Sequence, residues 1–250
     1  MNIERSDGIA LLRMTAGKAN AIGPAWLERM NVLLDELQAD PPRALVVTGE
    51  GRAFSAGLDL PALLRNSPES LTAFIRDFSE VMLRFFTHPW PVVAAINGHA
   101  IAGGCVLALQ ADHRLMAAGE GRIGLNEVQL GIGLPVVVVE TLRCQVPAAS
   151  LLPVAIEGAL FLPEEALRLG LVQEVVAADE LLERAFQRAG VLGTLPGPAF
   201  RHIKRGLRGP AVETIRQAEA ADAEAWVETF FSAPAQERVQ AAVARLLAKR

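Results

Sequence analysis

Three short stretches of the sequence carry residue types and spacings that suit catalysis. One is the glycine-containing loop at residues 52–60, which follows an apolar run of strand length. Another is the pair Gly103-Gly104 at the start of an uncharged helical pattern, and the last is Glu127, in a loop with few other charges. Small residues let a backbone approach a ligand, a bare helix N-terminus offers N–H groups to negative charge, and a carboxylate moves protons. Taken singly, each stretch also fits a structural role: a turn, close helix packing or a solvated carboxylate.

The second stretch belongs to a long uncharged segment, residues 92–111, which contains no Lys, Arg, Asp or Glu. We predict a buried strand at 92–96, a polar elbow at 97–99 and a helix from Gly103. The length of the segment would suit a membrane span, but the polar and glycine residues in its middle favour the core of a soluble enzyme. Its free helix N-terminus then predicts a site for an anion or oxyanion.

Strand and helix patterns alternate around this segment. The apolar runs predict strands at residues 9–14, 44–48, 113–117 and 171–177. Helical spacing predicts helices at residues 24–40, 69–86 and 163–169, whereas 136–142 fits either structure. This alternation indicates an α/β fold with a parallel sheet covered by helices.

Beyond residue 179 the pattern becomes helical, with helices expected at 180–189, 198–205, 211–232 and 234–250. The Pro and Gly cluster at 193–198 predicts a boundary there. We therefore expect an α/β core at residues 1–192 and a C-terminal helical region at 193–250. Pattern alone leaves open whether that region forms a subunit interface or packs on its own core.

Composition restricts the class of protein. The chain has 250 residues, 51% hydrophobic and 21% charged, with a net charge of −4 and no visible basic stripe, so nucleic acid is not an expected partner. Two cysteines and no signal peptide indicate a cytoplasmic protein without disulfides, and no membrane association is expected. No metal-ligand spacing, Walker A loop or dinucleotide fingerprint is present, so no metal and no separate cofactor are expected.

A family resemblance is carried by three motifs in order: VVTGEGRAFSAGLDL, AAINGHAIAGGCVLALQAD and IGLNEVQLGIGLP. Together they resemble the crotonase superfamily (enoyl-CoA hydratase/isomerase family), and a later segment, GALFLPEEALRLGLVQEVVAADEL, resembles the same family. The resemblance covers roughly residues 9–231. It implies a crotonase-like spiral of ββα units, whose C-terminal helices form a homo-trimer or a dimer of trimers.

The resemblance also implies a substrate, an acyl-CoA thioester. Its carbonyl oxygen would be held by an oxyanion hole made of the backbone N–H groups of Leu58 and Gly103. Further substrate-binding residues are implied at Lys18, Ala19, Ala56, Asp59, Leu60, Val106 and Arg245. Lys18 would face the adenine and phosphate end of CoA, although it also fits an ordinary exposed lysine. Arg245 lies near a position from which family members offer a basic residue, often to a neighbouring subunit.

The chain departs from the family's hydratases, which use two glutamates. The first falls on Val106 here, and the second falls on Glu127. One carboxylate suits the shift of a double bond better than the addition of water, and GLNEVQLGIGLP resembles single-glutamate Δ3,Δ2-enoyl-CoA isomerases. We expect an isomerase with Glu127 as the proton shuttle. A hydratase, another enolate reaction, or a catalytically weak acyl-CoA-binding protein are the alternatives. Glu140 can also reach the acyl pocket, but nothing in its spacing requires that.

Overall fold

The structure, a computed structural model, describes residues 1–248, apart from the side chain of Lys18. Its strands are β1 (Asn2–Ser6), β2 (Ile9–Met14), β3 (Ala44–Gly49), β4 (Ala53–Ser55), β5 (Val92–Ile96), β6 (His99–Ile101), β7 (His113–Ala117), β8 (Ile123–Gly124) and β9 (Glu174–Val176). Its α-helices are α1 (Pro24–Ala39), α2 (Leu60–Leu63), α3 (Pro68–Phe86), α4 (Gly103–Leu109), α5 (Val136–Gln145), α6 (Pro163–Arg168), α7 (Leu181–Gly193), α8 (Gly197–Phe231) and α9 (Ala233–Ala248). Short helical turns are η1 (Gly17–Ala19), η2 (Glu127–Leu130), η3 (Ala148–Ser150) and η4 (Leu152–Ile156).

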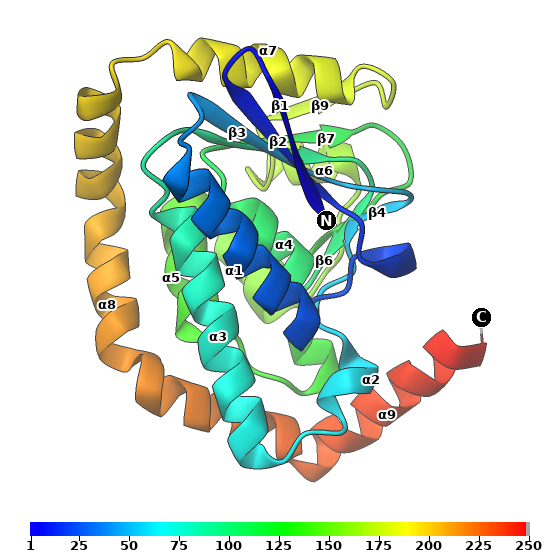
Figure 1. The fold of residues 1–250 in the computed structure, drawn as a ribbon. Helices are drawn as coiled ribbons and strands as arrows, with labels where there is room; N and C mark the ends of the chain where they lie inside the picture. The colour runs from blue at the N-terminus through cyan, green and yellow to red at the C-terminus, as the bar shows by residue number, and fades with distance from the viewer. Residues whose placement is uncertain (249–250) are drawn as a thin grey trace.

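The strands form two sheets. The larger has the order β1-β2-β3-β5-β7-β9 and is parallel except for β1, which pairs antiparallel with β2. The smaller has the order β4-β6-β8 and is wholly parallel. Successive strand pairs, β3 with β4, β5 with β6 and β7 with β8, each place one strand in each sheet before a helical segment follows (Figure 1). This repetition confirms the predicted spiral of ββα units.

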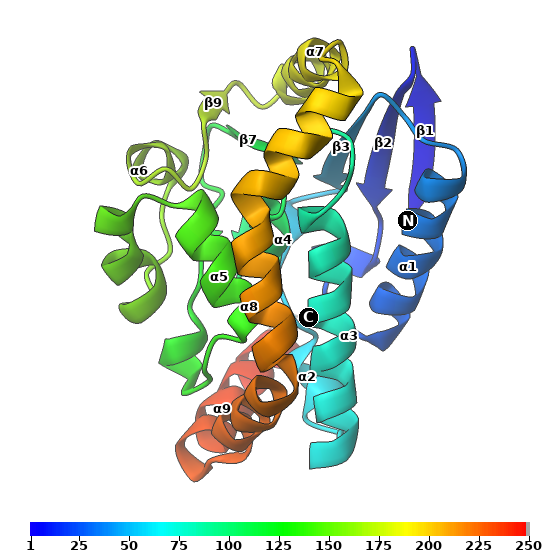
Figure 2. The ribbon, with the colours of Figure 1, turned by 90° about the vertical axis from the view of Figure 1, so that its left-hand side faces the viewer.

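Successive side chains along a strand point to opposite faces of the larger sheet, so the hydrophobic core is divided between its two faces. In β3, Ala44 and Val46 pack with the apolar side of α7. Leu45 and Val47 face the other way, into a larger core built with α1, α3 and α4. Both faces are therefore covered, as Figures 1 and 2 show, which explains why the parallel strands are apolar on both sides.

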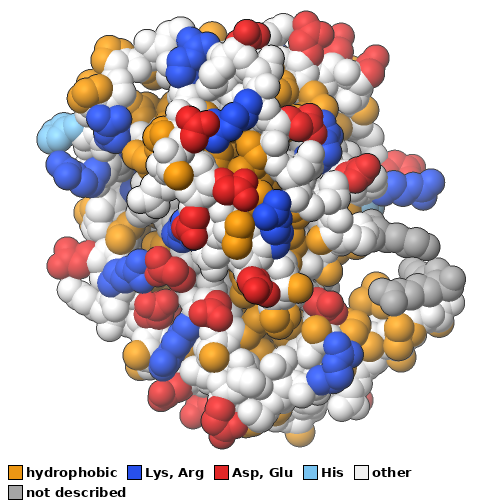
Figure 3. Space-filling view, viewed as in Figure 1, with side chains coloured by type: hydrophobic (Ala, Val, Ile, Leu, Met, Phe, Trp, Pro, Cys, Tyr) orange, Lys and Arg blue, Asp and Glu red, His pale blue; other side chains and the backbone are white. Residues whose placement is uncertain are grey.

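Helices α8 and α9 wrap around this body. Helix α8 packs along α3 and α5, and α9 then turns back to contact α2 and η2. Figure 3 shows acidic and basic side chains interspersed over one face, with hydrophobic side chains gathered along α9 at the lower right. Exposed apolar residues of this helix include Leu246 and Leu247. Within residues 1–248, no helix combines the length and apolar character needed to cross a membrane.

Most predicted elements are confirmed, and the ambiguous segment at 136–142 is helical. Four predictions are wrong. The loop expected at residues 52–60 contains strand β4 (Ala53–Ser55). The strand expected at 171–177 forms only at Glu174–Val176, and the elbow at 97–99 already contains the start of β6. The helices expected at 198–205 and 211–232 are one helix, with Pro210 inside it. Proline removes a backbone hydrogen bond, but Arg208 before it and Ala211 after it are both buried, so packing on either side holds the helix together.

Gly104 lets α4 lie directly against β4. A Cβ atom at this position would stand 2.1 Å from the carbonyl oxygen of Ser55, which is backbone and cannot easily move. Gly98, just before β6, lies equally close to the residue before β4, since a Cβ there would stand 2.1 Å from the Arg52 carbonyl oxygen. Gly104 therefore sets the spacing between β4 and α4, and Gly98 sets the spacing where β4 and β6 begin.

Gly104→Ala should therefore lower the free energy of unfolding by more than about 2 kcal/mol, because the new methyl group forces α4 away from β4. Gly206→Ala is the matched control, since a Cβ there meets nothing within 4 Å. In the middle of a helix that substitution should stabilise by about 1 kcal/mol. Urea unfolding measures both, and a Gly104→Ala protein as stable as wild type would contradict this packing.

Candidate active site

Three loops meet where the strands of the smaller sheet end. Residues 56–58 follow β4, Ala102 and Gly103 follow β6, and Asn126 and Glu127 lie just beyond β8. Because these strands are parallel, their carboxyl ends share one edge of the sheet, where α/β proteins commonly bind ligands. A cavity of about 560 Å³ opens there, lined by Ala56, Leu58, Leu60, Ile101, Ala102, Asn126, Glu127, Gln129, Leu130, Ile132, Trp226, Arg238, Ala241, Ala242, Arg245 and Leu246.

The backbone around Leu58 is held by residue Ile22. The Ile22 N–H donates to the Gly57 carbonyl oxygen at 2.8 Å, and the Asp59 N–H donates to the Ile22 carbonyl oxygen at 2.9 Å. Leu58 lies between these two bonds. Its own N–H donates to no acceptor within residues 1–248, so a positioned donor is left for a ligand.

Gly57 brings this loop against the start of α4. Its φ of 86° lies in the left-handed region, and a Cβ there would stand 2.7 Å from the Ile101 carbonyl oxygen and 3.0 Å from the Gly103 nitrogen. Only glycine fits that position. A Cβ on Gly103 would in turn lie 3.4 Å from the Leu58 side chain, so the two predicted donor residues are neighbours. As the first residue of α4, Gly103 has an N–H without an intrahelical acceptor.

Ala102, just before Gly103, has a strained backbone, with φ 51° and ψ −122°. This region costs a non-glycine residue about 1–3 kcal/mol. Two hydrogen bonds hold it: the Ala102 N–H donates to the Gly124 carbonyl oxygen at 2.9 Å, and the Val106 N–H donates to the Ala102 carbonyl oxygen at 3.0 Å. Ala102 therefore fixes the direction of the Gly103 N–H.

Glu127 combines burial with an unused oxygen. Its Oε2 atom is buried and has no hydrogen-bond partner among the described residues, and burial raises the pKa of the carboxyl to about 7. Cys105 of α4 is fully buried, and that burial, followed by the charge of Glu127, raises the pKa of its thiol. Among the described residues that line the cavity, Glu127 is the only carboxylic acid. Glu140 does not line it and pairs with Arg143 at 2.6 Å.

The cavity gathers five of the residues predicted from the sequence: Ala56, Leu58, Leu60, Glu127 and Arg245. Arg245 reaches it on α9 of the same chain. No group of three His, Cys, Asp or Glu side chains suited to a metal ion occurs in the described part of the chain.

Other predicted residues do not line the cavity. Asp59 caps α2, its Oδ1 accepting the Ala62 N–H at 3.1 Å. Val106 is buried in the hydrophobic core, and Ala19 lies beside the loop, its carbonyl oxygen bonded to the Ala56 N–H. The predicted contact of Lys18 falls on a side chain outside the described part of the structure.

The sequence analysis missed two prominent wall residues, Trp226 and Arg238. Trp226 is oriented by its indole N–H, which donates to the Gly133 carbonyl oxygen at 2.9 Å. Arg238 stands seven residues before Arg245 on α9, and this spacing places both arginines on one helix face. The seven-residue spacing of the two arginines could have been recognised in the sequence, whereas the position of Trp226 depends on how α8 packs.

Glu127→Gln should stabilise the protein at alkaline pH. The folded state binds the Glu127 proton more tightly than the unfolded chain, because the pKa rises from 4.5 to about 7. Wild type therefore loses stability as pH rises through this interval, and the amide escapes that cost. The expected gain in the free energy of unfolding is up to about 3 kcal/mol at about pH 8, and it should largely vanish at about pH 5. Urea unfolding at both pH values measures it.

Exposed Glu157→Gln is the control, and it should change stability little at either pH. Equal stabilities of wild type and Glu127→Gln at alkaline pH would contradict a buried, proton-retaining Glu127.

Comparisons with known proteins agree with this geometry. The family model described as enoyl-CoA hydratase/isomerase matches residues 4–248. The human protein named mitochondrial enoyl-CoA delta isomerase 1 is 29% identical over 242 residues, which cover 96% of this chain and 80% of that protein.

Two solved structures are also similar. The crystal structure of human mitochondrial delta3-delta2-enoyl-CoA isomerase has a TM-score of 0.95 at 28% identity, covering 100% of this chain and 98% of that one. That of an enoyl-CoA hydratase from Mycobacterium ulcerans has a TM-score of 0.84 at 31% identity, covering 92% and 98%. A family match along nearly the whole chain, together with the shared fold, shows that this chain belongs to the enoyl-CoA hydratase/isomerase family of the crotonase superfamily.

Proposed function

We propose that this protein is an enoyl-CoA isomerase, which moves the double bond of a 3-enoyl-CoA to position 2. The observation that carries the proposal is the single carboxylic acid among the described cavity residues, Glu127, whose Oε2 atom is buried and unpaired. A pKa of about 7 suits a group that must both accept and return a proton near neutral pH.

The reaction needs two proton transfers and one stabilised enolate. The Glu127 carboxylate removes a proton from C2 of the thioester, and the electron pair moves onto the carbonyl oxygen. The N–H groups of Leu58 and Gly103 hold that oxygen, and one such donor typically contributes about 3–4 kcal/mol. When the carboxyl group returns the proton at C4, the double bond lies between C2 and C3.

Cations for the CoA phosphates are proposed on α9, where Arg238 and Arg245 line the cavity of their own chain. Lys18 remains a predicted contact. Bound this way, CoA is part of the substrate, and the chemistry requires no further cofactor.

Hydration is the second candidate reaction, because relatives with hydratase names lie at similar identity. Adding water requires a water molecule to be held and activated, which family hydratases do with two carboxylates. Position 106, where the first would lie, is a buried valine in the core. This favours isomerisation.

Purified protein should isomerise 3-enoyl-CoA faster than it hydrates 2-enoyl-CoA of the same chain length. Glu127→Gln should lower kcat for isomerisation by at least about a hundredfold, because general acid–base catalysis contributes at least that much. Its binding of CoA should stay unchanged. Absorbance assays with substrates of several chain lengths measure both reactions.

Faster hydration than isomerisation in the wild-type protein would reject the isomerase assignment. Unchanged turnover in Glu127→Gln would instead remove this residue from the mechanism. If CoA thioesters bind but neither reaction occurs, the chain is a binding protein.

We also propose that the chain assembles as a trimer or a dimer of trimers. Support comes from Ile203 and Leu207 of α8, which are 61% and 74% exposed and stand one helical turn apart. Large apolar side chains exposed together often mark an interface.

Light scattering at micromolar concentration should give the mass of three or six chains. Leu207→Glu should shift the mass toward the monomer, since a charge buried at an interface is costly. Exposed Arg168→Gln is the control. A monomeric wild-type protein would reject this assembly.

A further inference from the structure

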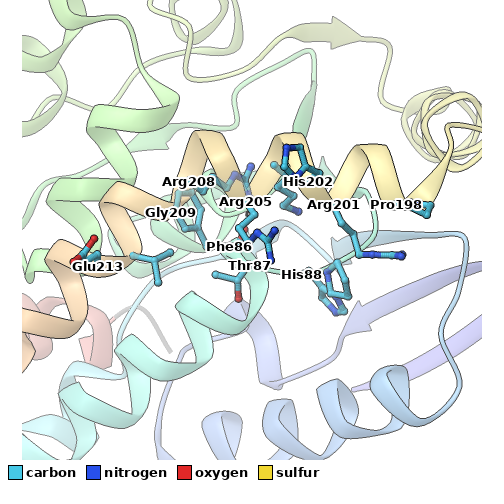
Figure 4. Close-up of a pocket in the computed structure, with 13 residues that line it drawn as sticks. Phe86, Thr87, His88, Pro198, Arg201, His202, Arg205, Arg208, Gly209 and Glu213 are labelled. Atoms are coloured by element: carbon cyan, nitrogen blue, oxygen red, sulfur yellow. Dashed lines mark hydrogen bonds between the residues drawn. The ribbon is translucent and has the colours of Figure 1, made fainter.

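A second cavity, of about 740 Å³, shares no residue with the Glu127 cavity. It lies between the end of α3 and the first half of α8 (Figure 4). Phe86 and His88 form part of one side, and Arg201 and Arg205 form part of the other. Its volume falls within the usual range for small-molecule sites.

The α8 side of this cavity is locally cationic in a chain of net charge −4. Residues 201–208 read RHIKRGLR, and no Asp or Glu occurs between Glu183 and Glu213. Among the described residues that line this cavity, Glu213 is the one carboxylic acid, and it lies at the opposite end from Arg201 (Figure 4). The positive charge at the Arg201 end is therefore not neutralised within the cavity.

The four cations of this segment have different partners. Lys204 and Arg208 are buried and both pair with Asp112, at 2.8 and 2.9 Å. Arg201 and Arg205 are exposed and form no ion pair within residues 1–248. Standing one helical turn apart, they offer two guanidinium groups to one anion, and guanidinium geometry suits carboxylates and phosphates.

His88 supplies an independent indication of a ligand. Its side chain is 5% exposed and its ring packs on Trp90, and its buried Nδ1 atom has no hydrogen-bond partner in the described part of the chain. Burial, followed by the charges of Lys204 and Arg84, lowers the pKa of His88 to about 3, so the ring is neutral. A buried polar atom without a partner is costly, and here it belongs to a side chain that lines the cavity.

The rest of the wall includes apolar surface from Pro89 and Val212, whereas the Phe86 ring is buried behind the Arg208 guanidinium. We propose that this cavity binds a small amphipathic organic anion. Its carboxylate or phosphate head pairs with Arg201 and Arg205, and its apolar part lies against Pro89 and Val212. A polar atom of the ligand pairs with His88.

The position of this site on α8 is compatible with the proposed oligomer. The buried residues Lys204 and Arg208 mark the inner side of α8. At 3.6 residues per turn, Arg201 and Arg205 flank that inner side on one edge, and Ile203 and Leu207 flank it on the opposite edge. A partner can therefore contact the apolar residues without covering the two arginines.

Isothermal titration of the 250-residue chain tests the proposal with four probes: octanoate, octyl phosphate, octanol and inorganic phosphate. At least one amphipathic anion should bind saturably and more tightly than octanol and inorganic phosphate. Comparison of octanoate with octyl phosphate tells which head group the site prefers. The double variant Arg201→Gln/Arg205→Gln should weaken that binding at least about tenfold, because two charge-assisted contacts are lost.

Arg168→Gln is the matched control and should bind as wild type does. The double variant Arg238→Gln/Arg245→Gln, which removes both arginines from the wall of the Glu127 cavity, should bind the probe normally, and this separates the two cavities. No saturable binding of either anion, or equal binding by the double arginine variant, would overturn the proposal. If the isomerase assays fail, these titrations still test this proposal, because they measure binding at a different cavity.

Discussion

The parallel pairing of β4, β6 and β8 is the constraint on which the site depends. Each strand has only two or three residues, yet together they align three loops that lie far apart in the sequence. In the β6–β8 pair, Ile101 stands opposite Gly124, whose carbonyl oxygen also holds the strained Ala102. Because side chains alternate along a strand, a slip of one residue would turn these loops to the wrong face. Gly98 and Gly104 permit the close spacing that this register needs.

A buried ion cluster connects this sheet system to the C-terminal helices. Asp112 accepts the Val92 N–H at the start of β5, and it pairs with Lys204 and Arg208 of α8. Removing one partner from such a buried cluster typically costs about 3–5 kcal/mol. The contacts fix where α8 begins its path along the body. That path determines where Trp226 and then α9 reach the proposed catalytic cavity.

The sequence predicted the longer elements, because Val92–Ile96 and the helix beginning at Gly103 carry clear patterns. It did not predict β8 from its residues, since two residues have no periodicity, and only the family resemblance implied the repeated units. The uninterrupted α8 was missed because packing around Pro210 outweighs a local breaker. Trp226 was missed because tertiary packing places it. The basic run at 201–208 was overlooked because the net charge of the whole chain is negative. The cytoplasmic location and the role of Lys18 remain predictions.

The division of the cavity wall between two parts of the chain has a consequence for how its selectivity can change. The donors and Glu127 belong to the ββα units, whereas much of the facing wall, including Ala241 and Ala242, belongs to α9. Substitutions on α9 can therefore reshape the space for a ligand without moving the groups beside the smaller sheet. One peripheral helix can thus alter ligand preference while the proposed geometry for proton transfer stays in place.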